Sequence, residues 1–215
     1  MNDHQSSAEA ADEKRYGTGW RRVVALFLDA AAFAPLGWLD QFIWNHTSAP
    51  SILLPWVVLN SLAWLAYPIG FVAVFGQTLG KMACGVRILD LQEMPVSFKQ
   101  AVLREIAPVV FTPYLLFLQA QNILGGRLAN RAYGDASGDF TAMTHVGLLS
   151  MAWILLEVIT MLTNSKRRAL HDFIAGTVVV RVEREKELLW FLLGLFALSL
   201  IVPELMEEHN MIRGK

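Results

Sequence analysis

Residues 52–75 constrain the fold most strongly, because this stretch of 24 residues is apolar and contains no charged side chain. A helix of about 20 such residues crosses the hydrocarbon core of a bilayer, which is about 30 Å thick. Four further apolar stretches lie at residues 23–44, 106–123, 146–163 and 188–203. Unpaired backbone amides are not tolerated in lipid, so each stretch is expected to be helical. The sequence therefore predicts an all-α, polytopic transmembrane helical bundle of four to five spans.

The composition agrees with a membrane protein and excludes several other classes. Of the 215 residues, 54% are hydrophobic and only 17% are charged, whereas a soluble domain is nearer to about 25% charged. The formal net charge of −1 leaves no general basic surface, which argues against a nucleic-acid partner. A single cysteine, Cys84, excludes an internal disulfide and a multi-cysteine metal site. We expect the lipid bilayer as the main partner, and no cofactor.

Three segments differ in character along the chain. Residues 1–15 are polar and predict a disordered N-terminal tail without a secretory signal. Residues 16–182 form the predicted membrane domain. Residues 183–215 predict a charged collar, an additional C-terminal transmembrane helix and a short tail. The apolar part of that last helix, residues 188–203, would measure only about 24 Å at helical rise, which is short for a complete crossing.

Two short β-branched segments bounded by glycines lie between the apolar stretches, at residues 85–91 and 176–182. Such segments are typical of strands. If the N-terminus lies inside, both segments lie on the cytoplasmic side, where they can pair into a small β-ribbon.

The distribution of basic residues predicts the orientation. With the N-terminus inside and five spans, fourteen of the 18 lysines and arginines lie on the inner side. Basic residues are concentrated in cytoplasmic segments of membrane proteins. The sequence therefore predicts a multi-pass protein of the cell (inner) membrane with a cytoplasmic N-terminus.

The motifs that suggest catalysis do not withstand inspection. Residues 76–82 resemble a phosphate-binding loop, but three residues rather than four separate Gly76 from Gly80, and Met82 follows Lys81 where a Ser or Thr is needed. Lys81 is instead expected to meet lipid phosphate. No nucleophile–base pair or metal-ligand ladder is present in the sequence, so we expect no enzymatic activity and no metal.

Ionisable residues within or beside the apolar stretches are more informative, since a charge at mid-bilayer costs about 3 kcal/mol or more. Asp29 and Glu157 lie at comparable depth in their stretches, whereas Asp40 lies near the outer end of its stretch, where an acid is easily hydrated. In one interpretation, Arg22, Asp29, Arg104 and Asp172 form an ion-pair network that fixes the helix ends to the ribbon. In the other, Asp29 and Glu157 exchange protons for small cations, and Arg22 and burial shift the pKa of Asp29 in opposite directions.

Four blocks of sequence, in order, resemble the RDD family of integral membrane proteins. They are residues 20–29 (WRRVVALFLD), 76–88 (GQTLGKMACGVRI), 97–104 (beginning with Ser97 and Phe98) and 168–178 (RALHDFIAGTV). The resemblance implies a bacterial protein with several spans, in which Arg22, Asp29 and Asp172 are the residues that give the family its name. It implies function only weakly, because some members are linked to sodium/proton exchange and distant relatives act as membrane adaptors.

Two functions follow as hypotheses. The first is a monovalent cation/proton transporter, or a subunit of one, in which Asp29, Glu157 and Asp172 bind ions or protons, and Arg22, Arg104, Arg168 and His171 are their charge partners. The alternative is a non-catalytic membrane adaptor or assembly protein, which forms a homo-oligomer or binds another membrane protein.

Overall fold

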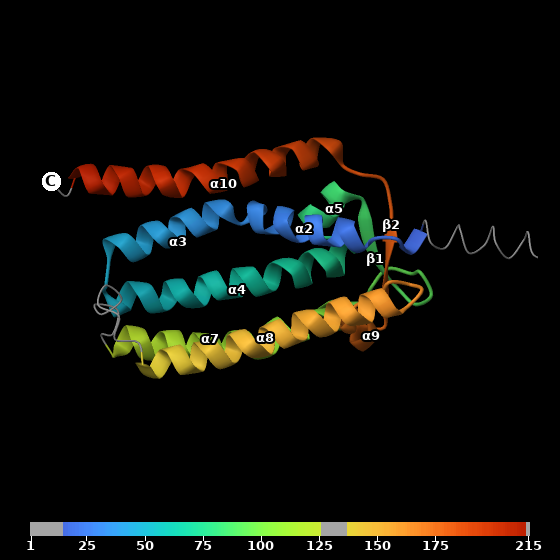
Figure 1. Cartoon of the computed structure of the whole chain (residues 1–215), viewed down its shortest axis with the longest axis horizontal. Coiled ribbons are helices and arrows are strands. Elements are labelled where there is room, and N and C mark those ends of the chain that lie inside the picture. Colours follow the sequence, from blue (N-terminus) through green and yellow to red (C-terminus); the bar gives the residue numbers. More distant parts are fainter. Residues whose placement is uncertain (1–14, 126–136, 214–215) are drawn as a thin grey trace, which may run out of the picture.

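The computed structural model describes residues 15–125 and 137–213, and the side chains of 15–125 and 147–202. The predicted disordered tail, residues 1–15, lies outside the described residues except for Arg15. The long helices lie side by side and run roughly parallel, and a two-stranded sheet lies at one end of them (Figure 1). We call this the sheet end and the opposite end the distal end.

The first helical segment is broken. Helix α2 (Gly19–Ala32) and helix α3 (Ala34–His46) are bent by 46° relative to each other. The break lies at Phe33, two residues before Pro35. A proline ring collides with the carbonyl four residues earlier and removes one hydrogen bond of the helix, so the chain bends here. The single span predicted at residues 23–44 is therefore a bent pair of helices.

Two helices are each long and apolar enough to cross a membrane, namely α4 (Pro50–Phe75) and α7 (Ile106–Leu124), and the bent pair would make a third. Helix α8 (Ser137–Thr163) contains a shorter apolar part, and helix α10 (Lys186–Arg213) is the last element. The predicted helical membrane bundle is thus confirmed among the described residues. The number of spans, four to five, stays a prediction.

The sheet joins two segments that lie far apart in the sequence. Strand β1 (Val86–Asp90) pairs antiparallel with strand β2 (Thr177–Arg181), so that the first residue of each strand faces the last residue of the other. The predicted small β-ribbon is therefore confirmed. A two-stranded sheet is marginally stable alone, and here Val86, Ile88 and Val179 are buried in a core shared with the helices.

The two strands are reached in the same way. Strand β1 follows the short helix α5 (Leu79–Cys84), and strand β2 follows the short helix α9 (Leu170–Ala175). Each short helix ends at a glycine in the left-handed conformation, Gly85 at φ 64° and Gly176 at φ 65°. Helix α5 packs on α2, and α9 packs on α6 (Phe98–Arg104). Each short helix therefore packs within its own half of the chain, α5 before residue 98 and α9 after it, and the two strands pair across the halves.

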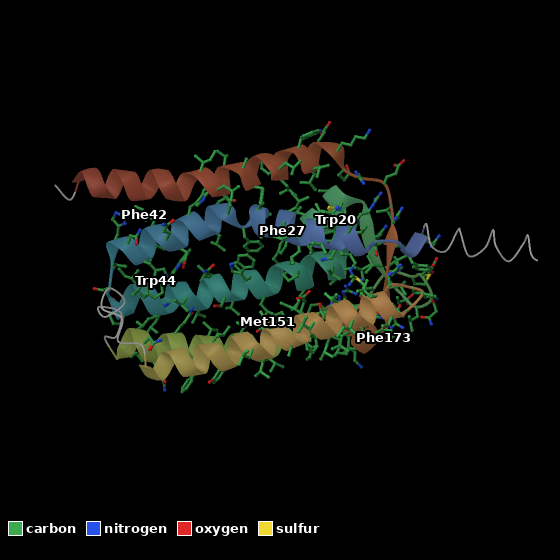
Figure 2. The ribbon with its side chains drawn as sticks, viewed as in Figure 1. Trp20, Phe27, Phe42, Trp44, Met151 and Phe173 are labelled. Atoms are coloured by element: carbon green, nitrogen blue, oxygen red, sulfur yellow. The ribbon has the colours of Figure 1, made fainter. Side chains whose placement is uncertain are left out.

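Burial is concentrated at the sheet end. The largest cluster of buried apolar side chains joins α2, α5, the strands and α10, while a smaller cluster of Leu53, Val57 and Ile123 lies at the distal end. Large apolar side chains elsewhere on the helices face outward, among them Trp20, Phe27 and Met151 (Figure 2). Such extensive apolar exposure fits a surface covered by lipid.

Candidate functional site

The Asp172 carboxylate is the centre of a buried charge cluster at the sheet end. Its side chain is 0% exposed, and it pairs with two arginines from other helices. Arg22 of α2 places Nη1 2.8 Å from Asp172 Oδ2, and Arg104 of α6 pairs through Nη1 with Oδ1. The two arginine side chains are themselves only 11% and 4% exposed. Three segments far apart in the sequence are therefore joined by charges that water does not reach.

Neutral donors complete the surroundings of this carboxylate. The Ala169 N–H donates to Asp172 Oδ2 at 2.9 Å, and the Thr177 hydroxyl lies 3.3 Å from Oδ1 while accepting from Arg104 Nη1 at 2.6 Å. Burial by itself raises the pKa of Asp172, but the charges of Arg104 and Arg22 lower it by more. The net pKa lies well below the ordinary value for aspartate, so Asp172 is a carboxylate at neutral pH.

Arg168 supports the same segment from the outside. Its Nη2 donates to the Asp172 carbonyl oxygen and its Nε to the Thr177 carbonyl oxygen, both at 2.9 Å. Its guanidinium carbon lies 4.1 Å from the centre of the Phe173 ring. Arg168 thus holds the backbone of α9 and the start of β2 and makes no direct bond to the Asp172 carboxylate.

His171 connects this cluster to Glu157. Its Nε2 lies 3.1 Å from Arg22 Nη2 and 2.9 Å from Arg104 Nη2. A guanidinium can only donate hydrogen bonds, so Nε2 must accept and the ring proton of neutral His171 lies on Nδ1. Nδ1 then donates to Glu157 Oε1 at 2.5 Å. The imidazole therefore bridges a carboxylate of α8 and the two arginines that hold Asp172.

Glu157 is the more accessible end of this series. Its side chain is 25% exposed, and Oε1 also accepts from the Trp153 indole N–H at 2.7 Å. The described contacts run from Glu157 through His171 to the arginines and Asp172. The series thus joins a partly exposed carboxylate at one end to a buried ion pair at the other.

Asp29 lies in a separate cluster. Its Oδ1 accepts from the Tyr67 hydroxyl and the Gly80 N–H, both at 2.7 Å, and its Oδ2 accepts from the Thr78 hydroxyl at 2.6 Å. Lys81 Nζ lies 4.0 Å from Oδ2. Burial is the largest influence on Lys81 and lowers its pKa. Asp29 therefore fixes α5 to α2 largely through neutral donors.

Gly80 allows the close approach of these two helices. A Cβ atom at Gly80 would lie 2.2 Å from the Ala25 carbonyl oxygen and 2.8 Å from the Asp29 nitrogen. No side chain fits in that space without movement of the backbone. Gly80 is therefore a packing position against α2.

These contacts correct three expectations from the sequence. Arg22 pairs with Asp172 and not with Asp29, so it is not the charge partner of Asp29. The network of Arg22, Arg104 and Asp172 forms, but Asp29 is not part of it. Lys81 lies beside Asp29 and Thr78 rather than reaching toward lipid phosphate.

Sequence reasoning missed the neutral members of both clusters. Tyr67, Thr78 and Thr177 carry no charge, and hydroxyl groups are common enough that only the folded structure distinguishes these three. One local signal existed for Thr177, because it directly follows the left-handed Gly176 that ends α9. Among the residues that the structure describes, no group of acids, histidines and cysteines is arranged to hold a metal ion.

The comparison with family models gives one match, to the RDD family, over residues 16–176. No curated protein and no solved structure matches the chain. The matched region includes the bent pair α2–α3, the three cluster residues Arg22, Arg104 and Asp172, and Asp29. It ends before β2 and α10. The match spans well over half of the 215 residues, and the chain therefore belongs to the RDD family, a family of membrane proteins.

Proposed function

We propose that this protein is a non-catalytic assembly protein of the cell membrane, with its sheet end in the cytoplasm. The single observation that carries this proposal is the complete burial of Asp172 between Arg22 and Arg104. A carboxylate that exchanges ions with water must meet water, whereas a carboxylate paired in a dry cluster holds helices in place. The family-defining charges thus support a fixed architecture at the sheet end rather than a permeation path.

A partner surface is available beside that cluster. Three apolar side chains are exposed here: Met94 after β1, Phe98 at the start of α6, and Phe173 on α9. Phe98 is 67% exposed. Exposed apolar side chains that are surrounded by polar residues are typical of interaction sites. We propose that another membrane protein binds here, on the cytoplasmic side.

Chemical cross-linking in intact membranes followed by purification in a mild detergent tests this proposal. The variants Phe98→Glu and Phe173→Glu place a charge on the exposed surface, and Gln92→Glu adds the same charge to an exposed residue of the neighbouring loop as a control. A partner that co-purifies with wild type and Gln92→Glu but not with the two phenylalanine variants supports the proposal. Recovery of this chain alone from every sample contradicts it, and a cross-linked dimer that persists in all variants assigns self-association elsewhere.

The contact between Glu157 and His171 favours monovalent cation/proton transport as a second candidate. A carboxylate within an apolar helix, bonded to an imidazole, places two groups that can carry a proton in direct contact. Everted vesicles loaded with a pH-sensitive dye and challenged with sodium test this function. Transport requires a sodium-dependent signal that Glu157→Gln removes and Glu183→Gln, an exposed acid, leaves unchanged. Equal signals in wild type, Asp29→Asn and Glu157→Gln would exclude transport through these acids.

A further inference from the structure

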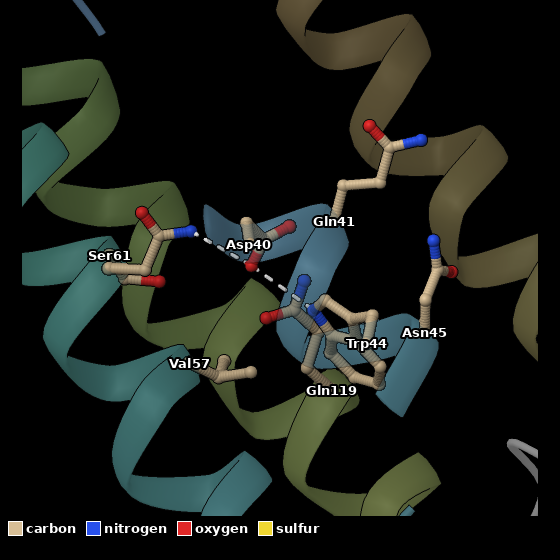
Figure 3. A pocket seen from close by; sticks show the side chains of 8 residues that line it. Asp40, Gln41, Trp44, Asn45, Val57, Ser61 and Gln119 are labelled. Atoms are coloured by element: carbon tan, nitrogen blue, oxygen red, sulfur yellow. Dashed lines mark hydrogen bonds between the residues drawn. The ribbon is translucent and has the colours of Figure 1, made fainter. Parts of the chain in front are cut away.

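The distal end contains a polar cavity of about 370 Å³ between α3, α4 and α7 (Figure 3). Its walls carry one carboxylate, four amides and a hydroxyl, from Asp40, Gln41, Asn45, Asn60, Gln119 and Ser61. The RDD charge clusters lie at the opposite end of the helices. This cavity is therefore a separate feature that neither proposed function uses.

Asp40 has no basic partner among the described residues. Its Oδ1 accepts from the Trp56 indole at 2.7 Å, the Trp44 indole at 3.1 Å and the Asn60 amide at 3.4 Å. All three donors are uncharged. Among the described residues, no lysine, arginine or histidine lies within 4.0 Å of this carboxylate. The carboxylate is thus oriented by neutral groups, and it lines the cavity.

The cavity wall also contains one unpaired acceptor. Asn60 Oδ1, on the α4 wall, is buried and has no hydrogen-bond partner among the described residues. Buried polar atoms normally find a partner. The unpaired atom is a carbonyl oxygen, and the cavity lining contains no lysine, arginine or histidine. A bound group that supplies a hydrogen-bond donor and a positive charge would complement this lining.

We propose that this cavity binds a primary ammonium group, either the ethanolamine headgroup of a lipid or a free small amine. A primary ammonium has three N–H donors and one positive charge, which matches the Asp40 carboxylate beside the amide carbonyl oxygens of the cavity wall. A quaternary ammonium has no donor to offer. The cavity far exceeds the roughly 30 Å³ that one water molecule occupies in the liquid, so it accommodates an organic group rather than a bare metal ion.

Binding to the full chain in detergent micelles tests this inference, with tryptophan fluorescence as the signal because two indoles bond to Asp40. The probes are ethanolamine, a short-chain phosphatidylethanolamine, the matching phosphatidylcholine and sodium chloride at constant ionic strength. Saturable binding of the ethanolamine lipid, at least tenfold tighter than the choline lipid and weakened at least tenfold by Asp40→Asn, is expected. Equal binding of free ethanolamine assigns a soluble amine, and binding of the lipid alone assigns a headgroup.

Two control comparisons separate binding from folding. Asp90→Asn removes an acid at the sheet end and should leave binding unchanged. Gln119→Leu removes a polar group from the α7 wall without altering Asp40 and should weaken binding, whereas Gln121→Leu, an exposed position on the same helix, should not. The proposal is overturned by an absence of saturable amine binding, by equal affinity in Asp40→Asn or Gln119→Leu, by equal binding of the choline lipid, or by a sodium response that depends on Asp40.

Discussion

The substitution Asp172→Asn is expected to destabilise this protein severely while changing only one atom in size and shape. Asparagine keeps one oxygen acceptor but loses the charge, so Arg22 and Arg104 are left facing each other with side chains 11% and 4% exposed. Removing one partner of a buried ion pair costs about 3–5 kcal/mol, because the remaining charge stays buried without compensation. We expect a loss of that size in the free energy of unfolding.

Equilibrium unfolding of the purified protein in detergent micelles, followed by helical circular dichroism during titration with a denaturing detergent, measures this loss. Glu183→Gln is the matched control, since it removes an acid from an exposed position, where substitutions change stability by about 0.5 kcal/mol at most. Combining Asp172→Leu with Arg104→Met should recover about 1–3 kcal/mol relative to Asp172→Leu alone, since coupled neighbours are not additive. Asp172→Asn as stable as Glu183→Gln would refute the reasoning.

The stabilisation that the Asp172 carboxylate provides should depend on pH. The pKa of Asp172 is lowered in the folded protein, so its stabilisation is complete above the unfolded-state pKa of about 3.9 and is lost as the pH falls through the folded value. The difference in unfolding free energy between wild type and Asp172→Asn should therefore stay constant between about pH 8 and pH 5 and shrink below about pH 4. A difference that already shrinks near pH 6 would contradict this assignment.

Three further predictions use other parts of the structure. Gly80→Ala should cost about 2–3 kcal/mol through overpacking, because its Cβ would lie 2.2 Å from the Ala25 carbonyl oxygen, whereas Gly70→Ala, with nothing within 4 Å, should be neutral in the same unfolding titration. His171→Leu should cost about 1–3 kcal/mol by leaving Glu157 and the arginines without their shared partner, and most of that cost should disappear when Glu157→Leu is already present. The predicted topology places Ser7 in the cytoplasm and Ser48 outside. In a Cys84→Ala background, a maleimide that cannot cross membranes should therefore label Ser48→Cys but not Ser7→Cys in intact cells. The reverse labelling pattern would show the opposite topology.

Local patterns explain what could be predicted from the sequence. Apolar runs identify helices in lipid because hydropathy is a property of neighbouring residues, and the two β-branched segments predicted the strands for the same reason. The bend at Phe33 was also readable in principle, since Pro35 follows it. These features need no knowledge of distant contacts.

Partner choice in the charge clusters could not be predicted in this way. Arg22 lies seven residues before Asp29 on one helix, which made Asp29 its nearest acid in the sequence, yet it pairs with Asp172, 150 residues away. Helix packing decides this, because α5 occupies the space beside Asp29 and supplies the Gly80 N–H and the Thr78 hydroxyl. Three neutral donors satisfy the Asp29 carboxylate, and Arg22 pairs instead with Asp172 in the second half of the chain.

The correspondence between the two halves gives a last, sharper test. Lys81 is the third residue of α5 and faces Asp29 on α2, while Asp172 is the third residue of α9 and faces Arg104 on α6, so the sign of the charge is reversed between halves. If Arg104 and Asp172 formed an isolated pair, the double variant Arg104→Asp/Asp172→Arg would restore stability. Arg22 crosses from the first half to Asp172, so the exchange places two cations together, and we expect the double variant to be no more stable than Asp172→Asn. Recovery to wild-type stability in the unfolding titration would show that Arg22 does not share this carboxylate, and that the two halves are held together by the sheet and apolar packing alone.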